Sequence, residues 1–313
     1  MLPSIAAVLR CLAVSWAVAA ISGGVPASLP QQPSRVVYVS VTDKNGATVP
    51  DMMPADFEVK VSGKTQPVMS VKPAQASFRV AMIVSDAGTG AFQASMARFM
   101  RKLQTNAKFA LTSVIVQPET VVDYTNDGEQ LNAGIRRLGP RGRQVGAQLM
   151  EAILETTKTV RAEGERPVIV VMRVGGEATT PLSGDDVKDE LRKSGALMYV
   201  ISTVGAERRA ASAARQGISS EQAQMHDDEN VSGALNLSQV LGDGSKESGG
   251  RHEQVISTTL IPTLEQIADE LLNQYAITYA FPDKAKPLDK LQVSSKRKGV
   301  TVRAPARVPP GVF

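Results

Sequence analysis

The chain has 313 residues, of which 42% are apolar and 21% charged, and it holds two histidines and a single cysteine, Cys11. These counts exclude a disulfide framework, a thiolate zinc site and a zinc or haem site rich in imidazole. With 35 basic against 31 acidic residues and 4% aromatic residues, they also argue against a nucleic-acid-binding protein. At roughly 100–200 residues per domain, the length predicts one large domain with an appendage, or two domains.

The first 27 residues have the pattern of a signal peptide. Residues 1–10 carry one positive charge, residues 11–21 form an apolar run, and a small-residue segment leads to Ala27. The run is shorter than the roughly 20 residues of a membrane span. We therefore expect an exported protein, periplasmic or secreted, cleaved after Ala27 or, as second choice, after Ala20. Cys11 stands at the start of the apolar run and not at its end, which argues against a lipid anchor, and its removal leaves a mature chain without cysteine.

Residues 34–75 predict a small N-terminal antiparallel β module. Apolar and polar residues alternate over residues 35–42 and again over 57–61, and turn dipeptides occur at Asn45-Gly46 and Ser62-Gly63. The segment is too short to form a full core alone, so we expect it to pack on the domain that comes after it in the chain.

Residues 76–282 predict an α/β domain with a doubly wound, mostly parallel sheet. Continuous apolar runs alternate with segments of helical period, which is typical of buried parallel strands covered by helices on both faces. Ser183 is expected to cap a helix that ends near Lys193, and Pro262-Thr263 to open the last helix. The expected strands are residues 79–85, 109–116, 120–124, 168–172, 196–202 and 275–281.

Two stretches depart from this alternation. Residues 205–232 are polar and rich in Ala, Gln and Ser, so we expect a flexible insertion. Residues 283–313 are basic and predict a C-terminal β-hairpin that turns at Lys298-Gly299. This tail is expected either to be a solvated hairpin whose lysines protect an exposed edge, or to be attracted weakly by charge to acidic envelope polymers.

Several short motifs occur in a fixed order along the chain. They are residues 41–46 (VTDKNG), 54–59 (PADFEV), 63–66 (GKTQ), 248–251 (SGGR), 267–271 (IADEL) and 273–279 (NQYAITY). In this order they resemble a bacterial family of secreted proteins related to the von Willebrand factor A domain. The match extends over nearly all of residues 35–303 and implies a Rossmann-like von Willebrand A fold.

The resemblance implies a metal-ion-dependent adhesion site. In the family an Asp-x-Ser-x-Ser loop, a Thr and a second Asp hold Mg²⁺ and leave one position for a carboxylate of a ligand protein. Here Asp86 keeps the first position, whereas Gly88 and Gly90 stand at the hydroxyl positions and Ala147 and Val174 at those of the Thr and the second Asp. With one ligand position retained, we expect a degenerate site without metal or cofactor.

Asp86 then has two interpretations. It is a strand-end acid that accepts N–H bonds from its own loop or caps the following helix. Alternatively, Asp86, Thr89, Gly90 and Glu177 form part of a metal-free surface that binds a partner. Glu151 and Glu177 are the candidates for replacement metal ligands.

Other chemistry has weak support. His226 and His252 are the only imidazoles for a hydrolytic triad, and Gly88-Thr89-Gly90 lacks the rest of a phosphate-binding loop. The sequence thus predicts an exported, non-catalytic interaction module that binds an unidentified protein through loops at the carboxyl ends of the sheet strands. The alternative is a Mg²⁺- or Ca²⁺-dependent adhesion or scaffold domain with substituted ligands.

Overall fold

The computed structural model describes residues 33–86, 88–138, 148–174, 180–203 and 232–310. The predicted signal peptide and, apart from Ser232, the predicted insertion lie outside these residues. Among the helices described, none combines the length and the apolar character that crossing a bilayer demands. The described chain consists of two regions: the α/β region (residues 74–274) and the β sandwich (residues 33–73 and 275–310).

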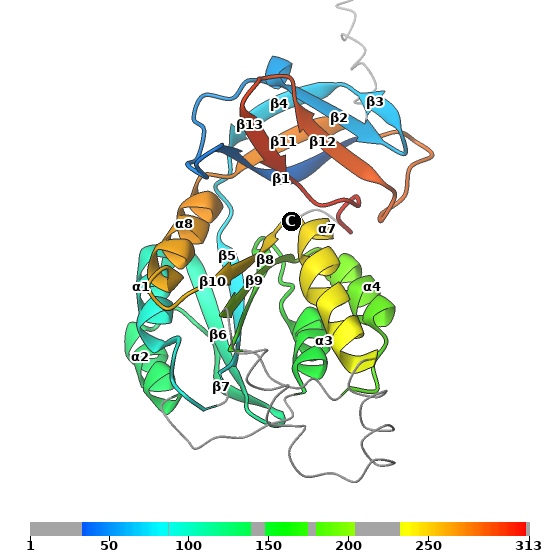
Figure 1. The fold of residues 1–313 in the computed structure, drawn as a ribbon. Helices are drawn as coiled ribbons and strands as arrows, with labels where there is room; N and C mark the ends of the chain where they lie inside the picture. Colours follow the sequence, from blue (N-terminus) through cyan, green and yellow to red (C-terminus); the bar gives the residue numbers. More distant parts are fainter. Residues whose placement is uncertain (1–32, 87, 139–147, 175–179, 204–231, 311–313) are drawn as a thin grey trace, which may run out of the picture. The chain divides into compact units, whose positions relative to one another are not determined.

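A six-stranded sheet forms the centre of the α/β region, in the order β10-β9-β8-β5-β6-β7 (Figure 1). The chain starts in the middle, moves outward to one edge and then outward to the other, which is the strand order of a doubly wound fold. All neighbours are parallel except β6 and β7, so the predicted fold class is confirmed. The strands are β5 (Phe78–Ser85), β6 (Ala107–Val114), β7 (Pro118–Thr125), β8 (Arg166–Arg173), β9 (Leu197–Thr203) and β10 (Arg251–Val255).

Helices cover both faces of this sheet. Successive residues of a strand point to opposite faces, and in β5 Val80 and Met82 belong to one apolar cluster while Ala81 and Ile83 belong to the other. The first cluster is completed by α1 (Gln93–Leu103), α2 (Gly128–Arg137) and α8 (Leu260–Leu272). The second is completed by α3 (Leu149–Thr159), α4 (Gly184–Ser194) and the π-helix η2 (Val240–Gly244), which is followed by α7 (Ser245–Glu247).

Helix boundaries follow local chemistry. The Ser183 side chain accepts a hydrogen bond from the Asp185 N–H at 3.2 Å, so the predicted cap of α4 is confirmed. Helix α8 begins at Leu260, two residues before the predicted Pro262. Proline is tolerated there because N–H groups in the first turn have no partner within the helix.

The β sandwich consists of two antiparallel sheets, β13-β1-β11-β4 and β12-β2-β3. Their apolar faces meet in one core that includes Val37, Val59, Ile277 and Tyr279. The elements are β1 (Ser34–Asp43), the 3-10 turn η1 (Pro54–Asp56), β2 (Phe57–Val61), β3 (Lys64–Gln66), β4 (Val68–Pro73), β11 (Tyr275–Ala280), β12 (Leu291–Ser295) and β13 (Val300–Arg303).

Two strand predictions are corrected by the pairing. The sequence predicts a strand of the central sheet at residues 275–281. In the structure this segment is β11 of the sandwich, which pairs with β1 through Val37 and Ile277 and with β4 on its other side. The place in the central sheet is taken by β10, which was not predicted. The helix-strand order alone could not distinguish these two strands, because both follow a helical segment.

The predicted hairpin near the C-terminus is also corrected. Strand β12 pairs with β2 and β13 pairs with β1, so the two strands lie in different sheets. Leu291 and Val293 thereby lie opposite Val61 and Val59, which buries apolar side chains that a free hairpin would expose. The predicted turn at Ser62-Gly63 does join a hairpin, β2 to β3, with positive φ at both residues.

Candidate functional site

The first loop at the carboxyl edge of the central sheet wraps around Asp86, which follows β5 and is 4% exposed. Its Oδ1 accepts the Gly88 N–H at 3.0 Å, and its Oδ2 accepts the Gly90 N–H at 2.6 Å. Gly88 and Gly90 have φ values of 72° and 71°, in the region that glycine adopts at least cost. The two glycines therefore let the backbone supply both partners of the carboxylate.

Thr89 stabilises the same loop. Its Oγ1 donates to the Asp86 carbonyl oxygen at 2.8 Å, and its N–H donates to the same oxygen at 3.1 Å. The side chain is exposed. The structure thus brings Asp86, Thr89 and Gly90 together, while Glu177 lies outside the described residues.

The other positions of the implied metal site do not add ligands. Ala147 lies outside the described residues, and Val174 is half-buried against the core with its N–H donated to the Ser85 carbonyl oxygen at 2.9 Å. Within the described part of the chain, no group of three or more His, Cys, Asp or Glu side chains could hold a metal ion.

Glu151 is the strongest candidate for a substitute ligand. It lies in the first turn of α3, where the helix dipole favours a negative charge. Its Oε1 accepts the Thr180 hydroxyl hydrogen at 2.7 Å, whereas its Oε2 is buried and has no hydrogen-bond partner among the described residues. A carboxylate from α3 and a hydroxyl from the segment before α4 are therefore adjacent, and one acceptor atom of the carboxylate is unused.

The exposed large apolar side chains of the α/β region occur along this edge. In the described α/β region only three large apolar residues are exposed: Val116, Leu235 and Ile256, at 43%, 67% and 55%. Val116 and Ile256 follow strands β6 and β10, and Leu235 precedes Asn236, which is bonded to the start of α4. All three lie near the carboxyl ends of strands, although β6 and β10 are separated by three strands of the sheet. Exposed apolar residues along such an edge are candidates for contact with a partner.

A serine and a histidine also meet near this edge. Ser202 Oγ on β9 is 2.8 Å from His252 Nε2 on β10, and Ser202 is 4% exposed. No pattern in the sequence predicts this pair, since the two residues are 50 positions apart and come together through the parallel pairing of β9 and β10. His226 lies outside the described residues.

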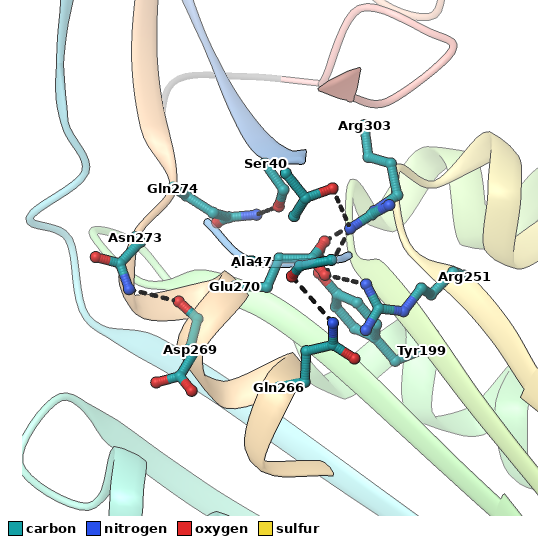
Figure 2. Close-up of polar contacts among 12 residues, drawn as sticks. Ser40, Ala47, Tyr199, Arg251, Gln266, Asp269, Glu270, Asn273, Gln274 and Arg303 are labelled. Atoms are coloured by element: carbon teal, nitrogen blue, oxygen red, sulfur yellow. Dashed lines mark hydrogen bonds and ion pairs between the residues drawn. The ribbon is translucent and has the colours of Figure 1, made fainter. Parts of the chain in front are cut away.

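A second polar cluster joins α8 to the β sandwich (Figure 2). The Glu270 side chain is fully buried and lies between Arg251 of β10 and Arg303 of β13; Arg303 Nη2 is 2.7 Å from Glu270 Oε2. Burial acts to lower the pKa of Arg303, but the hydrogen bond and charge of Glu270 raise it above the usual range overall. Tyr199 Oη donates to Glu270 Oε1 at 3.3 Å.

Arg166 forms a second polar contact between the two regions, in addition to the Glu270 cluster. This arginine is 4% exposed and donates to the Ala76 carbonyl oxygen and to Gln274 Oε1, whose side chain in turn donates to Ser40. Burial lowers the pKa of Arg166 to about 10. Neither cluster is predicted from the sequence, which shows Glu270 only as an acid inside the apolar stripe of the last helix and does not reveal its partners.

Comparison with known proteins gives matches among solved structures alone: no family model and no curated protein matches the chain. Several of the matched structures are von Willebrand A domains, the family that the sequence resembles. The von Willebrand domain of the type V pili tip protein Mfa5 from Porphyromonas gingivalis has 12% identity and a TM-score of 0.43, over 63% of this chain and 96% of that one. A von Willebrand factor type A protein from Catenulispora acidiphila has 10% identity and a TM-score of 0.39, over 90% and 75%.

A third match is proximal thread matrix protein 1 from the mussel byssus, whose structure has a zinc-occupied adhesion motif. It has 13% identity and a TM-score of 0.43, over 67% of this chain. The match spans about half of the mussel protein, 49% of its length. At these levels of similarity the fold of the present chain rests on its own strand order.

Proposed function

We propose that this chain is an exported, non-catalytic interaction module that binds a partner protein at the carboxyl edge of its central sheet, without a bridging metal. The exposed apolar residues at that edge, Val116, Leu235 and Ile256, are the observation that carries the proposal. The loop of Asp86, Thr89 and Gly90 follows β5 at the same edge of the sheet, and this loop and Glu177 are proposed to be part of the binding surface.

Metal independence is inferred from Asp86. Both carboxylate oxygens already accept loop N–H groups, so a cation would have to displace these bonds or share the oxygens. These hydrogen bonds give each carboxylate oxygen a partner without a metal. Binding is therefore proposed to depend on the shape and apolar character of the edge.

A bait experiment tests this function. The chain from residue 28 onward is used to capture proteins from envelope extracts, with and without a chelator, and compared with the triple variant Val116→Asp, Leu235→Asp, Ile256→Asp. Met69→Asp is the control, because Met69 is 52% exposed on the β sandwich. We expect a partner that is lost with the triple variant and retained with the control and with chelator. Loss of the partner on chelation would contradict a metal-free contact.

A metal-dependent adhesion or scaffold domain is the second candidate, favoured by the Glu151 Oε2, which has no hydrogen-bond partner among the described residues. Mg²⁺ and Ca²⁺ prefer oxygen ligands, and the Thr180 hydroxyl lies next to this carboxylate. In that case Glu151→Gln would abolish both metal binding and partner capture. Under the first proposal it leaves capture unchanged.

Export is tested separately. We propose cleavage after Ala27, and N-terminal sequencing of the protein recovered from the periplasm or medium checks it. A mature protein beginning at Ser28 is expected, and one beginning at Met1 would contradict export through this signal.

A further inference from the structure

Lysines in the two regions have different electrostatic environments. In the described α/β region five of the six lysines form ion pairs, namely Lys102, Lys108, Lys158, Lys188 and Lys193. In the β sandwich one of nine does, Lys60, which pairs with Glu58. The eight sandwich lysines that form no ion pair with the described residues are Lys44, Lys64, Lys72, Lys284, Lys286, Lys290, Lys296 and Lys298.

The balance of charge differs in the same way. The sandwich has 13 basic residues against 6 acidic ones, whereas the described α/β region has 16 against 19. Like charges within a Debye length of about 10 Å repel one another, so this concentration of cations does not stabilise the sandwich. Such a surface attracts an anionic ligand.

Part of this charge surrounds the outer face of sheet β12-β2-β3. The inward residues Phe57, Val59, Val61 and Leu291 are buried, so the alternate residues face outward. The outward positions hold Glu58, Lys60, Thr65, Gln292 and Ser294, and the pairing register places Lys60 opposite both Gln292 and Thr65.

Exposed lysines lie around these outward residues. Lys290 and Lys296 immediately precede and follow β12. Lys64 starts the edge strand β3, opposite the inward residue Val61. All three are exposed. The outer face is therefore a polar surface with cations at both ends of β12, and a further exposed cation lies on the adjacent edge strand.

An open groove adjoins this face. It has a volume of about 440 Å³ and lies between η1, β2, β3 and the start of β4, with Glu58, Thr65, Gln66 and Lys296 among its lining residues. The hydrogen bond from Lys60 is the main cause that lowers the pKa of Glu58, so this carboxylate is a hydrogen-bond acceptor at neutral pH. The groove thus offers a cation and an acceptor side by side.

These features discriminate between anionic ligands. A polyphosphate has no hydrogen to donate to Glu58 at neutral pH, whereas a sugar hydroxyl does. In the described sandwich no aromatic side chain is exposed, which disfavours stacking on nucleic-acid bases and anchoring at a membrane interface.

We propose that the outer face of sheet β12-β2-β3, with its adjoining groove, binds an acidic polysaccharide. Lys64, Lys290 and Lys296 attract its acidic groups, and Glu58 and Thr65 hydrogen-bond to its hydroxyl groups. This site lies on strands of the β sandwich, so it does not depend on the partner-binding edge of the α/β region.

Fluorescence anisotropy with labelled polygalacturonate, a carboxylated polysaccharide, tests the site in the chain from residue 28 onward. The variant Lys64→Glu, Lys290→Glu, Lys296→Glu is expected to bind at least about tenfold more weakly, a loss of about 1.4 kcal/mol. The matched control is Lys158→Glu, Lys193→Glu, Lys246→Glu, which changes the net charge equally in the α/β region and is expected to bind within about twofold of the unmodified chain. Equal weakening by both variants, or no binding by the unmodified chain, would overturn the proposal. Circular dichroism confirms that each variant is folded.

The variant Glu58→Gln separates a polysaccharide from other polyanions. It removes a charged acceptor, so polygalacturonate should bind about threefold or more weakly, while inorganic polyphosphate should bind equally or more tightly because a negative charge is lost. Tighter polygalacturonate binding by Glu58→Gln would contradict the proposal. Tighter binding of phosphatidylglycerol vesicles or of a DNA oligonucleotide than of polygalacturonate, at the same salt concentration, would also overturn it.

Discussion

The two regions differ in the sequence separation between strands that pair with each other. The α/β region is built from one continuous segment, and its central strand β5 pairs with β6, the next strand along the chain. The sandwich is assembled from both ends of the chain, so that Val37 of β1 lies opposite Ile277 of β11. The partner of a strand can be predicted from the sequence when it is the next strand along the chain. It cannot be predicted in this way when it lies near the other end of the chain.

The comparison extends to charge. Lysines of the α/β region are mostly neutralised by acids on the same or a neighbouring helix, such as Lys158 by Glu155 at 2.8 Å. Lysines of the sandwich lie mainly outside regular strands, and eight of the nine form no ion pair with any residue that the structure describes. The described lysines of the α/β region are therefore mostly neutralised by neighbouring acids, whereas the sandwich presents cations that lack an ion-pair partner among the described residues.

Removal of residues 282–313 should have the largest effect, because it deletes β12 and β13 and exposes one apolar side of the sandwich core. Hydrogen exchange should then show rapid exchange of the β1 and β2 amides. Amides of β8, at the centre of the other region, should stay protected for much longer. Retained protection of β2 would contradict a sandwich built from both chain ends.

Glu270→Ala should be the most destabilising single change, by about 3–5 kcal/mol, because it leaves the partly buried Arg251 and Arg303 without their shared anion. Urea unfolding followed by circular dichroism measures the free energy. Glu155→Ala is the control: its ion pair with Lys158 is exposed, and its loss should cost under about 0.5 kcal/mol. Equal losses would show that Glu270 does not hold the two regions together.

Gly250→Ala should cost about 1–3 kcal/mol or more, since the added Cβ would lie 2.0 Å from the Met198 carbonyl oxygen on β9. Gly242→Ala is matched to it, because nothing described lies within 4 Å of a Cβ at that position. Thermal unfolding should show a clear loss for the first variant and little change for the second. A similar loss at both sites would refute a close approach of Gly250 to β9.

Tyr199→Phe should have a small effect that depends on pH. Burial is the main cause that raises the pKa of Tyr199 well above its usual value of 10.0. The tyrosine stays protonated in the folded chain while it ionises in the unfolded chain, so its contribution to stability is present below pH 10 and declines above it. The variant should lose about 0.5–1.5 kcal/mol at neutral pH and show a shallower decline in alkali. An unchanged alkaline slope would contradict this.

The sequence predicted the α/β region well because its strands are buried on both faces and form continuous apolar runs, as in residues 79–85. One of the two interpretations of Asp86 from the sequence was that it accepts N–H hydrogen bonds from its own loop, and the structure has these bonds. The assignment of β11 was wrong because an alternating strand after a helix fits either sheet. The Glu270 cluster could not be predicted, since Arg251 and Arg303 reach it from strands that the sequence alone does not place.

The most direct test of the account is a calorimetric titration of the chain from residue 28 onward with Mg²⁺, Mn²⁺ and Ca²⁺. Because the Asp86 carboxylate is held by the N–H groups of Gly88 and Gly90, we predict no binding tighter than about millimolar, roughly −4 kcal/mol. Asp86→Ala should leave the titration unchanged. Tighter binding that Asp86→Ala or Glu151→Gln abolishes would contradict a metal-free interaction surface.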